Sequence, residues 1–150
     1  MNAEELARWL KDEHKTVHKL ATKLQERVAS IPSANHATWV GHVRDAFEHF
    51  RAHLTKVMAL KEKDGYMLQV LEQRPHLSRE VERLAHEHQE FTSLMNMIHQ
   101  TLEKIQPNDF LLMRDCCHRV QDLLSYIEHH DYNENLIVTS AFNLDIGGWD

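Results

Sequence analysis

Two side chains that can bind metal or exchange protons, His130 and Glu134, lie four residues apart in a stretch with helical periodicity. Residues with this spacing stand one above the other on the same face of a helix. The same face carries apolar residues, so the imidazole and the carboxylate are predicted to enter a hydrophobic core, which is costly unless a metal ion, an ion pair or a hydrogen-bond network satisfies them. The apolar positions in this register are Met113, Cys116, Val120, Leu123, Ile127 and Ile137.

Three histidines, His14, His88 and His130, each interrupt the apolar stripe of a different predicted helix. A single core histidine is usually satisfied by a carbonyl group or a water molecule. If the helices pack antiparallel, however, all three fall at one level, and convergent imidazoles can hold zinc or ferrous iron. This arrangement favours a present or former metal site. His18 and His53 fall one turn away and are expected at its rim.

The second predicted helix places an aliphatic and a cationic side chain at these levels. Val57 falls at the level of the three histidines, and Lys61 falls one turn further on, opposite Glu134. Valine has no lone pair to offer a metal ion, and a protonated lysine cannot act as a ligand. An ion pair between Lys61 and Glu134 would satisfy the buried carboxylate, although desolvation offsets much of the attraction.

Long amphipathic helices must position these residues. The chain contains only 4 Gly and 3 Pro, and its apolar residues recur with the three-and-four spacing of helices that pack together. We predict an all-α protein, an antiparallel up-down-up-down four-helix bundle. Ser78 is the predicted N-cap of the third helix. The predicted helices cover about residues 3–29, 36–63, 78–105 and 110–140, with a short helical or irregular crossing at 66–73.

Length and composition limit the classes of function. The 150 residues are expected to form one domain, with the bundle over residues 1–140 and a tail over 141–150 that packs on the bundle through Trp149 or is disordered. The formal net charge of -6 argues against a nucleic-acid partner. No apolar run could span a bilayer and no secretory signal is present, so we expect a cytoplasmic protein without a membrane partner. No nucleophile–base pair or phosphate-binding loop is evident, so an enzyme is not the favoured interpretation.

These motifs resemble the hemerythrin-like, or HHE cation-binding, family, and the resemblance covers nearly the whole chain. In that family two helices each begin with a Glu-His pair, and the other two each carry a His-x-x-x-Glu. The matching positions here are Glu13-His14, Glu87-His88, and His130 with Glu134. Three further segments look like a bacterial branch of the family, namely Asp64-Gly65-Tyr66, Arg74-Pro75 and Asp145-Ile146-Gly147-Gly148.

The resemblance implies a bundle built around a non-haem di-iron centre, in which imidazoles bind each iron and two glutamates bridge the irons. Carboxylates and imidazoles suit iron and leave a position open for a small molecule. Members of the family bind oxygen, sense oxygen or redox state, or handle nitric oxide and iron. The implied partners are therefore a metal ion and a small diatomic molecule.

The sequence departs from the family pattern on the second helix. Counted back from Gly65, the expected histidine and glutamate ligands fall on Val57 and Lys61, so both are replaced. A lysine cation in a partly buried site also repels a nearby metal ion. Reversible oxygen carriage of the usual kind needs both irons and is not expected.

Three interpretations remain open from the sequence. An intact di-iron site would need substitute ligands, for which only Glu62 and His53 are near, and both are off register. A metal-free relic, held by the Lys61–Glu134 ion pair, would act in regulation or protein interaction. A degraded site would bind at most one iron or zinc ion per chain, as a binding or sensing module. The candidate ligands of that ion are His14, His88, His130 and Glu134, with His18 and His53 as additional candidates.

Overall fold

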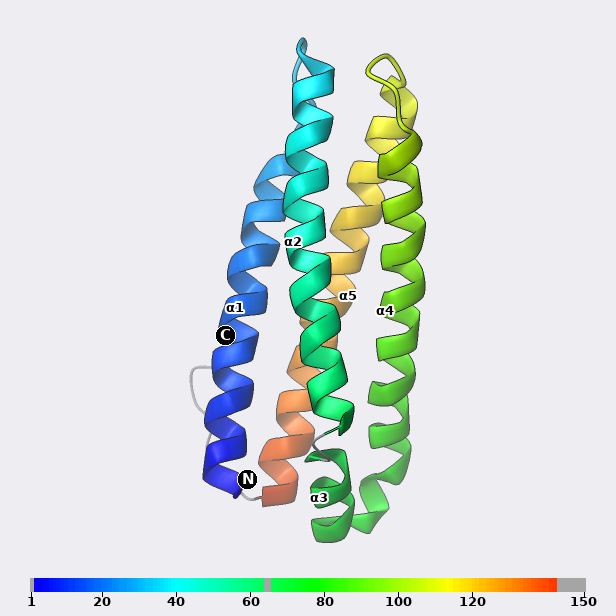
Figure 1. The fold of residues 1–150 in the computed structure, drawn as a ribbon. Coiled ribbons are helices and arrows are strands. Elements are labelled where there is room, and N and C mark those ends of the chain that lie inside the picture. Colours follow the sequence, from blue (N-terminus) through cyan, green and yellow to red (C-terminus); the bar gives the residue numbers. More distant parts are fainter. Residues whose placement is uncertain (1, 64–65, 143–150) are drawn as a thin grey trace.

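The chain is almost entirely helical in the computed structural model, which describes residues 2–63 and 66–142. The four long helices lie alongside one another, and a short helix lies at the end of the molecule where α2 ends and α4 begins (Figure 1). The all-α prediction is confirmed. In chain order the elements are α1 (Ala3–Val28), α2 (His36–Lys63), α3 (Tyr66–Gln73), the 3₁₀ helix η1 (Pro75–Leu77), α4 (Ser78–Lys104) and α5 (Phe110–Phe142).

The helix boundaries follow the sequence periodicity closely. The predicted segments 36–63 and 66–73 coincide with α2 and α3, whereas α5 continues two residues beyond the predicted end at 140. The rest of the predicted tail, including Trp149, lies outside the described residues. Within the described part of the chain, no helix is both long enough and apolar enough to cross a bilayer.

Helices α1 and α4 both begin at the end of the molecule where α3 lies, but their N-termini are capped differently. Asn2 caps α1, because its side chain accepts a hydrogen bond from the Glu5 backbone N–H at 2.8 Å while Glu5 reaches back to the Asn2 N–H. The prediction that Ser78 caps α4 is wrong. Ser78 is already helical, and its backbone N–H donates to the Pro75 carbonyl, because the 3₁₀ turn at 75–77 leads directly into α4.

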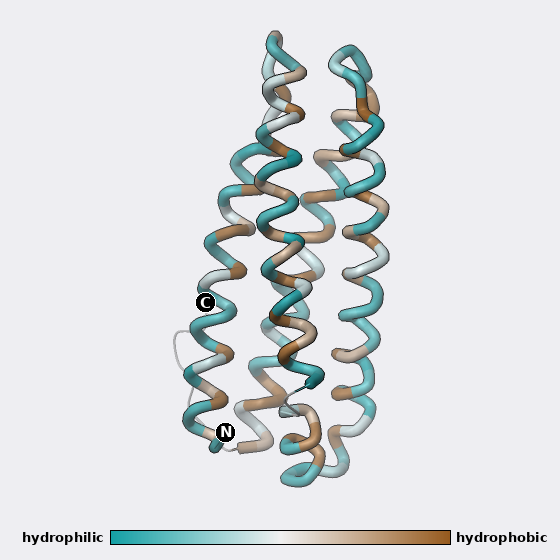
Figure 2. Tube along the Cα trace, viewed as in Figure 1, coloured by the Kyte–Doolittle hydropathy of each residue, from teal (hydrophilic) through white to brown (hydrophobic). Residues whose placement is uncertain are grey.

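Among the described residues, apolar side chains fill the interior in two main clusters, with buried polar residues between them along α1, α4 and α5. Figure 2 shows hydrophobic segments recurring along the inner side of the helices. On α5, for example, Ile127 belongs to one cluster and Ile137 to the other, with His130 and Glu134 between them. The same order, apolar then polar then apolar, holds at His14 on α1. The fold therefore encloses a polar layer within an apolar core.

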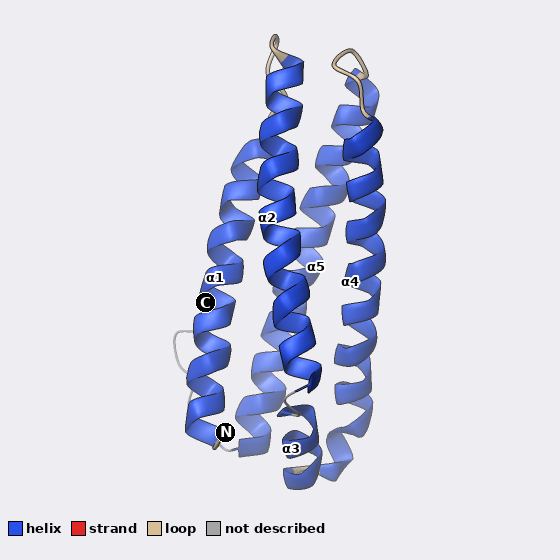
Figure 3. Ribbon diagram, in the orientation of Figure 1, coloured by secondary structure: helices blue, strands red, loops and turns tan. Residues whose placement is uncertain are grey.

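The loops at the end opposite α3 are joined to each other. Figure 3 shows the α1–α2 and α4–α5 connections at the same end of the molecule. His36 lies 2.8 Å from the Pro107 carbonyl oxygen through Nδ1 and 2.8 Å from the Pro32 carbonyl oxygen through Nε2. One side chain therefore bridges both loops, far from the polar layer.

Candidate metal centre

Each of the four long helices contributes at least one ionisable side chain to the polar layer. The buried charged or polar side chains of the described residues are between 0 and 8% exposed. They are His14, Lys61, His88, His130 and Glu134. Val57 is 1% exposed, so both Val57 and Lys61 on α2 face the interior. The prediction that these side chains share one region of the core agrees with their contacts.

Glu134 is the centre of a hydrogen-bond network. Its Oε1 lies 2.7 Å from Lys61 Nζ and 2.7 Å from His14 Nε2, and its Oε2 accepts a hydrogen bond from the Tyr66 hydroxyl. The predicted ion pair is therefore present in the structure. Burial raises the pKa of Glu134, but the positive charge of Lys61 and the hydrogen bond from His14 outweigh it and hold that pKa well below its usual value. Glu134 is a buried carboxylate anion whose charge is compensated.

His88 and His130 are held in a different way, each by a carboxylate on its outer side. His88 Nδ1 lies 3.1 Å from Glu62 Oε1, and His130 Nδ1 lies 2.8 Å from Glu87 Oε1. Because an ionised carboxylate only accepts hydrogen bonds, each Nδ1 carries a proton. In the neutral imidazole the lone pair is then on Nε2. Burial and the neighbouring His130 lower the pKa of His88, which favours this neutral form.

The inner nitrogens of these two histidines lack protein partners. Nε2 of His88 and Nε2 of His130 are both buried, and neither has a hydrogen-bond partner among the described residues. The two rings are neighbours, with centroids 5.0 Å apart. A buried nitrogen without a partner loses its hydration without compensation. Imidazoles that bind metals commonly donate the other ring N–H to a carboxylate, as both do here.

Within the described part of the chain, two groups of three potential ligands share Glu134. In the first, one ligand atom from each of His88, His130 and Glu134 lies within 4.8 Å of the others, and in the second the same holds for His14, Asp131 and Glu134. The first group offers two imidazole lone pairs and a carboxylate, a donor set that suits iron or zinc.

The second group lies directly beside a cation. Lys61 Nζ lies 2.7 Å from Glu134 Oε1 and 3.5 Å from His14 Nε2, so a positive charge is already present at two of its three members. Two unit charges about 4 Å apart repel by roughly 4 kcal/mol at an effective dielectric constant of 20. Lys61 therefore contacts two members of the second group, Glu134 and His14, and one member of the first, Glu134.

The remaining predicted positions lie around this centre without joining it. His53 is 23% exposed, with Nε2 3.3 Å from Glu13 Oε2, and His18 is exposed on α1. Neither belongs to the two ligand groups found among the described residues. Glu62, considered as a substitute ligand, is 52% exposed and contacts His88 at the outer nitrogen instead. The structure therefore brings together His14, His88, His130 and Glu134, and leaves His18 and His53 outside.

Sequence reasoning assigned no contact to three side chains that surround the centre. Asp131 follows His130 directly, Glu87 precedes His88 in the Glu-His pair, and Tyr66 begins α3. Asp131 Oδ1 lies 3.6 Å from His14 Nε2, and burial raises the Asp131 pKa. The adjacency of Glu87 to the candidate ligand His88 was the available signal for a carboxylate partner. Nothing in the periodicity indicated that Tyr66 would reach Glu134 from a crossing helix.

Comparison with known proteins identifies one family. The family model for the hemerythrin HHE cation binding domain matches residues 5–141. This range includes all the candidate ligands and nearly the whole of the four long helices. No curated protein and no solved structure shows significant similarity to the chain.

Proposed function

This chain belongs to the hemerythrin family, and on that premise we propose that it binds a single metal ion, iron or zinc, at His88, His130 and Glu134. The four long helices are taken as the antiparallel up-down-up-down bundle of that family. The observation that carries the proposal is the pair of buried Nε2 atoms that have no hydrogen-bond partner in the described part of the chain. A metal ion would satisfy both nitrogens at once.

The surrounding side chains prepare the imidazoles for this role. Glu62 and Glu87 accept hydrogen bonds from the Nδ1 atoms of His88 and His130, so they fix the orientation of each ring and direct its lone pair inward. Glu134 supplies a carboxylate that stays ionised because Lys61 compensates its charge. An ion bound by these three residues would supply Lewis acidity and a free coordination position for a small diatomic molecule.

Lys61 takes the place of a second ion. Its ammonium group contacts the carboxylate that would otherwise bridge two metals, and Val57 supplies no ligand beside it. A degraded centre of this kind should not carry oxygen reversibly in the usual manner, which requires two irons. We therefore favour a role in metal binding or in sensing through one ion.

A second candidate function is a metal-free scaffold that acts in regulation or in protein interaction. The observation in its favour is that Glu134 already has three partners, Lys61, His14 and Tyr66, and needs no metal. This alternative gives the Nε2 atoms of His88 and His130 no partner among the described protein residues, which is why we rank it second.

Metal stoichiometry distinguishes the two candidates. The purified protein is loaded with Fe²⁺ without oxygen, or with Zn²⁺, passed over a chelating resin, and analysed for metal by mass spectrometry. We expect about one ion per chain, retained in the control His129→Asn, because His129 is exposed, and lost in His130→Asn. Folded wild-type protein without metal would favour the scaffold, and two ions per chain would contradict the proposed replacement by Lys61.

A further inference from the structure

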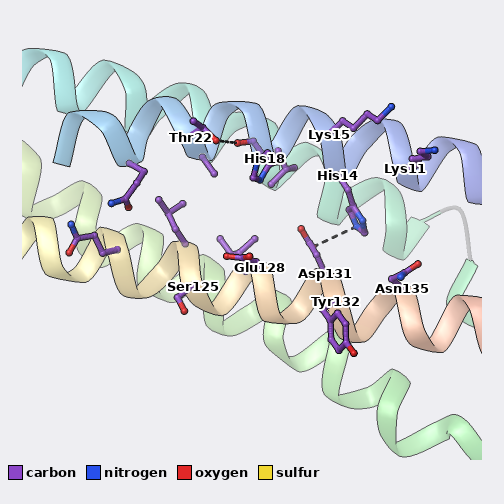
Figure 4. A pocket seen from close by; sticks show the side chains of 16 residues that line it. Lys11, His14, Lys15, His18, Thr22, Ser125, Glu128, Asp131, Tyr132 and Asn135 are labelled. Carbon is purple, nitrogen blue, oxygen red and sulfur yellow. Dashed lines mark hydrogen bonds and ion pairs between the residues drawn. The ribbon is translucent and has the colours of Figure 1, made fainter. Parts of the chain in front are cut away.

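A groove with a volume of about 690 Å³ runs between α1 and α5, next to the polar layer (Figure 4). This volume lies within the range of small-molecule sites in proteins, roughly 300–1,000 Å³. His14 and Asp131 belong to its wall, so the groove borders the network around Glu134. Its apolar lining consists of Val17, Ala21, Leu124 and Ile127.

The two ends of the groove differ in charge. Figure 4 shows Lys11 and Lys15 at one end, on the α1 side, with Asn135 facing them from α5. Neither lysine forms an ion pair within the described residues. The other end is lined by uncharged polar residues, among them Thr22 and Ser125. Two lysines without an ion pair among the described residues therefore lie beside an apolar surface, although the formal net charge of the chain is -6.

The acidic side chains of the groove lie away from the cationic end or are engaged. Glu128 lies across the groove from His18, nearer the N-terminus of α5 than Asp131 and Asn135 (Figure 4). Asp131 is directed to His14, with 3.6 Å between Asp131 Oδ1 and His14 Nε2. The charge available to a ligand at the Lys11–Lys15 end is therefore positive.

We propose that this groove binds a small organic anion with an apolar body, whose acidic group pairs with Lys11 and Lys15 and whose body lies on the apolar lining. Charge complementarity selects the anion, and the apolar lining selects against simple inorganic ions. The groove lining does not include His88, His130 or Glu134, the three proposed metal ligands, and the proposal does not depend on metal binding. It can therefore be tested on metal-free protein, where failure of one proposal leaves the other unaffected.

The probes are a pair of fluorescent naphthalenes that share an apolar body and differ in charge. The anionic probe is 8-anilinonaphthalene-1-sulfonate, and the uncharged one is N-phenyl-1-naphthylamine. We expect saturable binding of the anionic probe, weakened about five- to tenfold in Lys11→Gln/Lys15→Gln, since each exposed charge pair contributes up to about fivefold in affinity. The uncharged probe should be unaffected by these substitutions. Lys19→Gln is the matched control, because Lys19 is exposed on the same helix outside the groove.

Competition and blocking complete the test. Decanoate should displace the anionic probe, and inorganic phosphate at the same concentration should not, because phosphate has no apolar body. Ala21→Trp should abolish binding of both probes by filling the groove. The proposal is overturned if the lysine substitutions leave the anionic probe's affinity unchanged, if they weaken both probes equally, or if both probes still bind to a folded Ala21→Trp variant.

Discussion

Removing the charge of Glu134 should destabilise the protein strongly, because Lys61 would then be a buried cation without a counter-ion. Lys61 and Glu134 are 3% and 0% exposed, and Lys61 Nζ lies 2.7 Å from Glu134 Oε1. Removing one member of a buried pair leaves an uncompensated charge, which costs about 3–5 kcal/mol. We therefore expect Glu134→Gln to lower the free energy of unfolding by that amount.

The assay is urea denaturation at neutral pH with a chelator present, followed by circular dichroism, so that no metal contributes. The matched control is Asp115→Asn, which removes a carboxylate of similar geometry from the surface. Arg119 Nε lies 2.9 Å from Asp115 Oδ2, but these side chains are 46% and 52% exposed. Exposed pairs contribute about 1 kcal/mol or less, so the control should change stability little.

A double-mutant cycle separates the ion pair from other effects of the substitution. Lys61→Met alone should also destabilise, because it leaves the Glu134 anion with only His14 and Tyr66. Lys61→Met/Glu134→Gln should recover at least half of the loss, since the remaining groups are neutral and similar in volume. If Glu134→Gln costs no more than Asp115→Asn, the reasoning is refuted, because Lys61 must then reach water.

Three further predictions concern the metal ligands and the buried thiols. Glu87→Gln should weaken Zn²⁺ binding about 10- to 100-fold in a competition titration, because His130 loses the carboxylate that orients it; unchanged affinity would exclude that role. Val57→His/Lys61→Glu should raise iron content toward two ions per chain and produce oxo-bridge absorption, and no gain would show that these positions are not the replaced ligands. Burial raises the pKa of Cys116 from 9.0 to about 12, so the native thiol should react with a maleimide at pH 8 only after unfolding. Because the folded-state pKa is the higher one, the stability this thiol contributes should be complete below pH 9 and fall as pH rises toward 12, which urea titrations across that range would detect.

Helix periodicity was sufficient to identify which residues face the interior. A helix turns by a constant angle per residue, so an apolar stripe assigns every position in its register to the same face, whatever the side chain. Val57, Lys61 and His88 were placed in the core on this ground, and all three are at most 3% exposed. The cap at Ser78 was predicted from the residue type instead, and it was wrong because capping depends on the conformation of the preceding turn.

The sequence by itself determined the helices, their inward faces and the approximate level of each polar side chain. Only the tertiary structure decided which atoms meet. Lys61 shares one oxygen of Glu134 with His14, and Tyr66 reaches the other oxygen from α3. Carboxylates contact the outer nitrogens of His88 and His130, whose inner nitrogens have no partner among the residues that the structure describes. The reason is physical, since periodicity locates a side chain only to within about a turn, or 5.4 Å along the axis. A hydrogen bond requires about 3 Å between specific atoms, and this depends on how neighbouring helices pack.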